Sequence, residues 1–147
     1  MQEVLVERVI DAPRDLVWQV YTDHVSWQDW SSIGKVRLET EGVPAPNGVG
    51  CVRVISNAGV AAYEEVVSWD PPTRMTYRVL KGGLPIRDHL GEVDFSDEPG
   101  GRTRIVWRCR FDSKIPGLGG LFRIIVRKVF SDTLTALGRY DFGKEAA

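Results

Sequence analysis

The fold of this chain is decided near its C-terminal end by the stretch RTRIVWRCRFD, residues 102–112. Charged and apolar side chains alternate along it, so that Arg108 and Arg110 fall on one side and Trp107 and Cys109 on the other. Successive side chains of a β-strand point to opposite faces of its sheet, and the arginines belong in water. The stretch is therefore predicted to be a strand of an antiparallel sheet, with its Trp107 side turned toward the core.

The segment before it, residues 86–96, is predicted to be the neighbouring strand. Its acidic residues would lie on the outer face, across from the arginines, where the two rows can form cross-strand ion pairs. The arginine row could instead bind nucleic acid, but 19 Lys+Arg stand against 20 Asp+Glu in the chain. A sequence-independent nucleic-acid binder needs a cationic surface, so we expect no nucleic-acid partner. The outer set is Asp88, Leu90, Glu92 and Asp94, and the inner set is Arg87, His89, Gly91, Val93 and Phe95.

Working outward from this pair, period-two segments separated by turn residues predict an antiparallel meander. The six predicted strands are residues 34–41, 50–56, 60–69, 75–81, 86–96 and 102–112. A first strand at residues 2–10, a helix beginning at Asp11-Ala12-Pro13 and a short helical segment at 24–30 precede them. One long helix is predicted over residues 118–142. The fold class is therefore α+β, with one curved sheet around the last helix.

The composition is that of an ordinary globular domain. The chain has 147 residues, of which 43% are hydrophobic and 27% charged, so we predict a single domain over residues 1–147. Five tryptophans are the unusual feature.

No apolar run is long enough for a membrane span and no signal peptide is recognisable, so a cytoplasmic location is expected. With two histidines and no C-x-x-C pair, neither a metal site nor a cofactor is expected.

The predicted inner surface mixes large aromatic side chains with a few polar ones. On the strand at 60–69, Tyr63, Glu65, Val67 and Trp69 would face inward, although Val66 interrupts the alternation. An apolar cavity with a few convergent polar groups is typical of a small-molecule site. Any one of the aromatic residues Tyr77, Trp107 or Phe122 alone favours a packed core, so the indication of a site comes from Glu65 and His89 on the same predicted surface. The predicted ligand-contacting residues are Trp27, Trp30, Tyr63, Glu65, Tyr77, His89, Trp107, Phe122, Ile125, Val129 and Thr133.

His89 is the residue best suited to proton transfer, because imidazole titrates near neutral pH. Glu65 could orient it or act as a base, and Tyr77 could donate a hydrogen bond to a developing enolate. The alternative is a structural histidine. The tentative catalytic residues are therefore His89 and Glu65.

Four landmarks, taken in order along the chain, resemble those of the START/Bet v 1-like (SRPBCC) superfamily, and within it the polyketide cyclase/dehydrase and lipid-transport group. They are Asp11-Ala12-Pro13 with Val17-Trp18, Trp27-x-x-Trp30, Glu64-Glu65-Val66, and Trp69-Asp70-Pro71-Pro72. The resemblance implies a helix-grip fold, in which a curved seven-stranded antiparallel sheet holds a long C-terminal helix over a deep cavity. Aromatic polyketide cyclases of this group place arginine and serine in the pocket on the strand before the Asp-Pro turn. The row predicted here is Tyr63, Glu65 and Val67, which departs from that pattern.

Three functions follow as hypotheses. The first is a protein, monomeric or homodimeric, that binds a small hydrophobic molecule such as a lipid, a polyketide or another aromatic or isoprenoid compound. The second is a polyketide cyclase or aromatase that uses a His/Glu pair in the pocket. The third is a protein-interaction module of the chaperone-activator kind, which would require a large exposed apolar patch.

Overall fold

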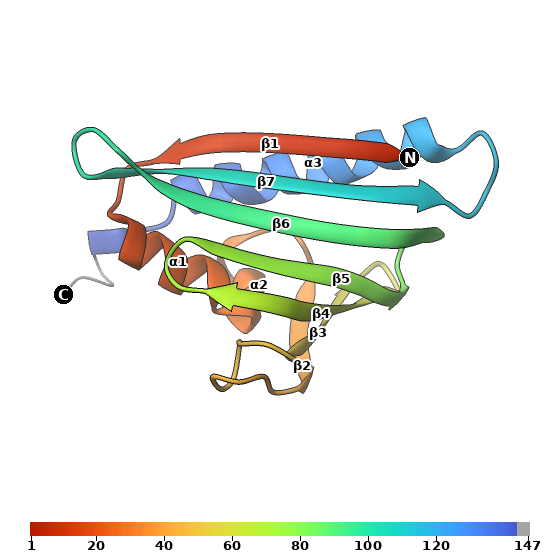
Figure 1. Ribbon diagram of the computed structural model, residues 1–147, viewed down its shortest axis with the longest axis horizontal. Helices are drawn as coiled ribbons and strands as arrows, with labels where there is room; N and C mark the ends of the chain where they lie inside the picture. The colour runs from red at the N-terminus through yellow and green to blue at the C-terminus, as the bar shows by residue number, and fades with distance from the viewer. Residues whose placement is uncertain (144–147) are drawn as a thin grey trace.

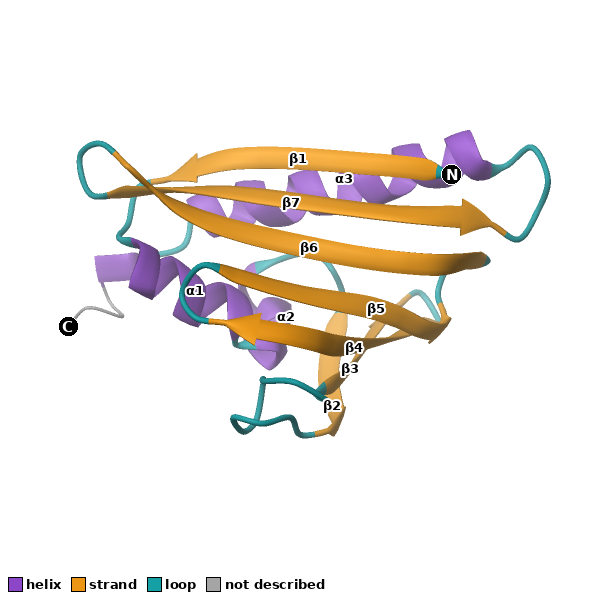
Figure 2. Ribbon diagram, viewed as in Figure 1, coloured by secondary structure: helices purple, strands orange, loops and turns teal. Residues whose placement is uncertain are grey.

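The computed structural model describes residues 1–143 and shows a curved antiparallel sheet packed against one long helix (Figures 1 and 2). The sheet has seven strands in the order β1-β7-β6-β5-β4-β3-β2. The elements are β1 (Gln2–Ile10), α1 (Arg14–Thr22), the 3-10 helix η1 (His24–Ser26), α2 (Trp27–Trp30), β2 (Lys35–Thr40), β3 (Val52–Asn57), β4 (Val60–Asp70), β5 (Arg74–Gly82), β6 (Ile86–Glu98), β7 (Arg102–Ser113) and α3 (Gly119–Gly138).

The predicted α+β helix-grip fold is confirmed, including the short helices after the first strand. The last helix is shorter than predicted: α3 ends at Gly138, where the backbone N–H groups of Arg139 and Tyr140 bond to the carbonyls of Ala136 and Leu137, three residues back, at 3.0 and 3.1 Å. The prediction of a single domain extends to residues 144–147, which lie outside the described residues. Within residues 1–143 no helix is both long and apolar enough to cross a membrane.

The outer face of the sheet carries the predicted cross-strand ion pairs. Arg108 lies opposite Glu92 in the register of β6 and β7, with Nε 3.8 Å from the carboxylate. Arg104 Nε lies 2.6 Å from Glu98. Such exposed pairs contribute little stability individually, but they give the arginine row its partners within the sheet.

The core lies between the inner face of the sheet and the helices. Trp107 stacks on Phe130 of α3, with ring centroids 3.9 Å apart and an interplanar angle of 12°. This contact sets the rotation of α3, on which Phe130 and Leu134 are both buried, although neither was among the residues predicted to contact the ligand. Cys51 and Cys109 are free thiols, both buried.

Candidate ligand-binding site

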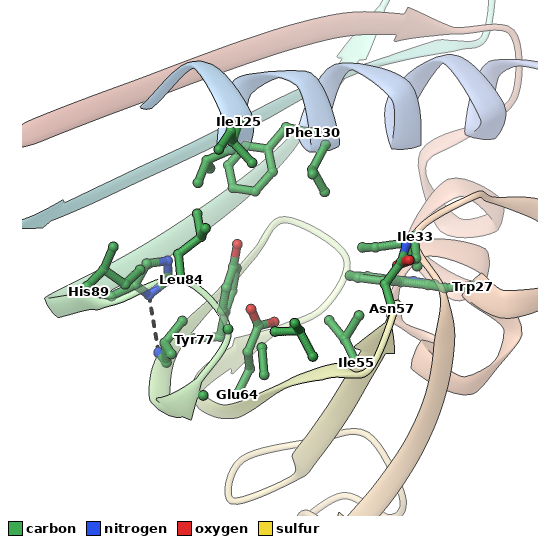
Figure 3. A pocket seen from close by; sticks show the side chains of 18 of the residues that line it. Trp27, Ile33, Ile55, Asn57, Glu64, Tyr77, Leu84, His89, Ile125 and Phe130 are labelled. Atoms are coloured by element: carbon green, nitrogen blue, oxygen red, sulfur yellow. Dashed lines mark hydrogen bonds between the residues drawn. The ribbon is translucent and has the colours of Figure 1, made fainter. Parts of the chain in front are cut away.

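A cavity of about 450 Å³ lies between the inner face of the sheet and α3 (Figure 3). This volume is within the range of small-molecule sites. Strands β3 to β6 form one side of the cavity and α3 the other, with Trp27 at one end. Most lining side chains are apolar, and the polar ones are Asn57, Glu64, Tyr77 and His89. Of the predicted ligand-contacting residues, those that line the cavity are Trp27, Tyr77, His89, Trp107, Ile125 and Val129.

The inward orientation predicted for Tyr63, Glu65 and Val67 is wrong. Glu65 pairs with Arg78 on the outer face, at 2.8 Å, and the Tyr63 ring lies 4.5 Å below the ammonium of Lys81. The register of β4 shifts between Val66 and Ser68, so Val67 is an extra residue in a β-bulge. Because of this bulge, Tyr63 and Glu65 lie on the opposite face of the sheet from Trp69, whereas the prediction placed all three on one face.

Three other predicted contacts lie away from the cavity. Phe122 is buried but does not line it. Thr133 donates its hydroxyl to the carbonyl of Val129, one turn earlier in α3. Trp30 donates its indole N–H to Ser26 Oγ at 3.0 Å.

Glu64 takes the inward position that was assigned to Glu65, and it is held there by Arg53. The two residues face each other in the register of β3 and β4. Arg53 Nε donates to Glu64 Oε1 at 2.9 Å, and Nη2 lies 2.9 Å from the same oxygen. The Arg53 side chain is 0% exposed, and its guanidinium lies between the rings of Trp27 and Tyr77, at 4.6 and 4.5 Å from their centroids. A buried charge of this kind needs both the ion pair and the aromatic faces.

Sequence reasoning missed this ion pair, although the chain carries a signal for it. Arg53 stands inside the otherwise apolar run CVRVI, residues 51–55. An arginine with apolar neighbours on both sides in a strand is a candidate for burial, and a buried arginine requires an acid on an adjacent strand.

Tyr77 is positioned by Trp107 and Gly91. Trp107 Nε1 donates to the Tyr77 hydroxyl oxygen at 2.8 Å, so the hydroxyl hydrogen is left to donate elsewhere. The Tyr77 ring lies over Gly91, its register partner on β6, where a Cβ atom would overlap it. Burial, with a smaller effect of Glu64, raises the pKa of Tyr77 well above its ordinary value, so the group is a neutral donor at physiological pH.

A second bulge lies just before His89 in β6. The register of β6 shifts between Arg87 and Leu90, and Asp88 has φ +54°, a left-handed conformation. The extra residue turns Arg87 out to solvent, against the prediction, and leaves His89 facing inward, as predicted. Its Nδ1 accepts the backbone N–H of Val79 at 3.2 Å, so the neutral ring carries its proton on Nε2. Burial lowers the pKa of His89, which favours this neutral form.

The second histidine, His24, predicts a pH dependence of stability. It is fully buried, with Nδ1 3.8 Å from Cys51 Sγ, and burial, aided by the nearby Arg53, places its pKa well below the ordinary 6.5. The unfolded chain therefore binds a proton that the folded chain does not, and stability falls as pH drops below about 6.5, by at most about 1.4 kcal/mol per pH unit for this group. Urea unfolding between pH of about 7.5 and about 5.5 measures this slope. A His24→Gln variant is expected to show a shallower slope, and an unchanged slope would contradict the assignment.

The predicted catalytic pair does not form, because Glu65 lies on the outer face while His89 faces the cavity. The cavity instead presents the Glu64 carboxylate together with neutral Tyr77 and His89 side chains. Within residues 1–143, no group of three or more His, Cys, Asp or Glu side chains is arranged to hold a metal ion. What the arrangement offers is an apolar space with one anionic acceptor and neutral hydrogen-bond donors.

Comparison with known proteins agrees with the fold. An uncharacterized protein of Mycobacterium bovis is 32% identical over 63 residues, which are 42% of this chain and 36% of that protein's length. The solved structure of the protein XoxI from Bacillus cereus has a TM-score of 0.78 at 19% identity, and the match covers 95% of this chain and 94% of that one. A START superfamily protein from Mycobacterium smegmatis has a TM-score of 0.77 at 10% identity, covering 92% and 94% of the two chains.

At these identities the structural matches establish the fold alone, and the assignment to a family rests on the sequence itself. The match to the family extends over residues 1–140 and so includes β1, the complete sheet and all of α3. The chain belongs to the polyketide cyclase/dehydrase and lipid transport family.

Proposed function

We propose that this protein binds a small, largely hydrophobic ligand in the cavity between the sheet and α3. The observation that carries the proposal is the cavity of about 450 Å³, lined mainly by apolar side chains and by a few polar ones. Packed protein interiors leave few voids larger than a water molecule, so a space of this size is more than a packing defect. The cytoplasmic location and the monomeric or homodimeric state remain predictions from the sequence.

The side chains of α3 provide an apolar route into the cavity. Ile125 and Val129 line it and are each 38% exposed, and on the same helix Leu121 is 51% and Ile124 63% exposed. Exposed apolar side chains that continue into a cavity are typical of a ligand entrance. The third hypothesis, a protein-interaction module, also requires exposed apolar surface, but it does not account for the cavity behind these residues.

Filling the cavity tests the proposal. An Ala62→Phe variant places a phenyl ring where the small Ala62 side chain now lines the space, and we expect it to weaken binding of the neutral apolar probe N-phenyl-1-naphthylamine by at least about tenfold. Binding is measured by probe fluorescence and by energy transfer from Trp27 and Trp107, which line the cavity. Tyr63→Phe, at the next position but facing outward, is the matched control and should leave the affinity unchanged. A folded Ala62→Phe variant with undiminished affinity would rule out this cavity as the site.

A second candidate function is ring closure of a poly-β-ketone, which the presence of His89 and Tyr77 in the same cavity favours. Because Nδ1 of His89 already accepts the Val79 N–H, the neutral ring offers a donor rather than a base. Glu64 would then have to remove the proton while Tyr77 and His89 donate to the enolate oxygen. Turnover of a poly-β-ketone that is lost in Tyr77→Phe and His89→Ala would support this candidate, and turnover retained in both would refute it.

A further inference from the structure

Among residues 1–143, no cation lines the cavity. None of the lining residues in this range is Lys or Arg, and Glu64 is the one carboxylate among them. Arg53, the cation that contacts Glu64, does not line the cavity, and its guanidinium packs against the rings of Trp27 and Tyr77. Its charge is directed at Glu64, which two of its nitrogens contact. An anionic ligand group would therefore meet the Glu64 carboxylate without a compensating partner.

The Glu64 carboxylate has capacity left for a ligand. Both Arg53 contacts are to Oε1, at 2.9 Å each, so Oε2 remains available as an acceptor. Figure 3 shows the carboxylate turned into the cavity, on the same side as the Tyr77 ring. A ligand group that approaches Oε2 must donate a hydrogen bond to it.

Two of the other polar groups of the cavity, Tyr77 and His89, are donors, while the third, Asn57, donates its amide N–H to the carbonyl of Ile33 at 3.2 Å. The Tyr77 hydroxyl accepts from Trp107 Nε1 at 2.8 Å, which leaves its hydrogen for a ligand. His89 accepts the Val79 N–H at Nδ1, which leaves Nε2–H for a ligand, and its ring centroid lies 5.4 Å from that of Tyr77. A ligand group between these residues must therefore accept as well as donate.

We propose that the ligand is an apolar alcohol or phenol, whose hydroxyl donates to Glu64 and accepts from Tyr77 or His89. The proposal rests on the function proposed above and narrows the class of ligand. A carboxylate or phosphate ion can accept, but it has no hydrogen to donate to Glu64 Oε2, and no Lys or Arg among the cavity-lining residues of 1–143 would offset its desolvation. An ammonium can donate to Glu64, but it cannot accept from Tyr77 or His89, and Arg53 already balances the charge of Glu64. The hydroxyl is the simple group that satisfies both kinds of partner.

Three compounds that share an octylphenyl body test the preference: 4-octylphenol, 4-octylbenzoate and octylbenzene, each competing with N-phenyl-1-naphthylamine near neutral pH. We expect 4-octylphenol to bind about three- to tenfold more tightly than octylbenzene and at least about tenfold more tightly than 4-octylbenzoate. If 4-octylbenzoate binds as tightly as 4-octylphenol, or 4-octylphenol no more tightly than octylbenzene, the hydroxyl preference is refuted while binding in the cavity stands. If none of the three displaces the probe, the proposed function itself fails.

Two variants connect the preference to the named groups. Tyr77→Phe keeps the ring and removes the hydroxyl donor. The ratio of the 4-octylphenol affinity to the octylbenzene affinity should therefore fall, while the octylbenzene affinity itself changes by less than about twofold. Glu64→Gln keeps the shape of the side chain and removes its charge, so the difference in affinity between 4-octylphenol and 4-octylbenzoate should become smaller. If Glu64→Gln does not fold, Tyr77→Phe and His89→Ala decide together. A 4-octylphenol affinity advantage over octylbenzene that is unchanged in both folded variants would refute the assignment of Tyr77 and His89 as the donors.

Discussion

An Arg53→Met variant should lose about 3–5 kcal/mol of unfolding free energy, the largest effect that we expect from any single substitution in this chain. Arg53 is fully buried, and it is the partner that Glu64 contacts at 2.9 Å. Without the guanidinium, the carboxylate faces an apolar cavity with no compensating charge. Urea unfolding near neutral pH, followed by tryptophan fluorescence, measures the loss.

Two further variants separate the ion pair from the packing of the Arg53 side chain. In Arg53→Met/Glu64→Leu both charges are gone, and we expect much of the lost stability to return, because apolar replacements of a buried pair are often nearly neutral. Lys128→Met removes an exposed pair, in which Lys128 Nζ lies 2.6 Å from Asp132, and should change stability little. A single Arg53→Met variant as stable as the double variant would show that the unpaired carboxylate costs nothing, against our expectation.

A Gly91→Ala variant should lose about 2–3 kcal/mol, the second-largest effect. The added methyl group would overlap the Tyr77 ring, which lies directly over Gly91 on the neighbouring strand. The ring must then move, and with it the hydrogen bond that its hydroxyl receives from Trp107. Urea unfolding measures the stability, and near-ultraviolet circular dichroism reports the disturbed aromatic packing.

Gly120→Ala is the matched control for this effect. Gly120 lies in the first turns of α3, and a Cβ built on it meets no atom within 4 Å. Alanine favours a helix more than glycine does, so this variant should be as stable as the parent or slightly more stable. If Gly91→Ala behaved like Gly120→Ala, the Tyr77 ring could not be packed against Gly91 as described. Adding Tyr77→Leu to Gly91→Ala should recover part of the loss.

The order and type of the elements were predictable because each depends on a local signal. The alternation around Trp107 identified β7, and β1 was predicted with its observed bounds, Gln2–Ile10. The acids of β6 and the arginines of β7 paired as expected, because neighbouring antiparallel strands bring opposite charges together. The α+β class follows from these elements, the helix-grip fold was implied by the family resemblance, and both were confirmed.

The faces of the strands were predictable only where the alternation is unbroken. Tyr77 on β5 faces inward as predicted, whereas Tyr63 and Glu65 on β4 face outward. The bulge at Val67 accounts for the difference. A bulge is set by the register with the neighbouring strand, which a single segment does not reveal.

The sequence by itself determined the fold class, the strand order along the chain, the aromatic inner surface and the inward position of His89. Only the tertiary structure decided that Glu64 rather than Glu65 enters the cavity, that Arg53 is buried against it, and that α3 presents Phe130 to Trp107. The physical reason is how far apart along the chain the residues lie that determine each feature. Alternation and helical spacing are carried by consecutive residues, whereas a bulge, a buried ion pair and the rotation of a helix depend on partners that are distant in the chain.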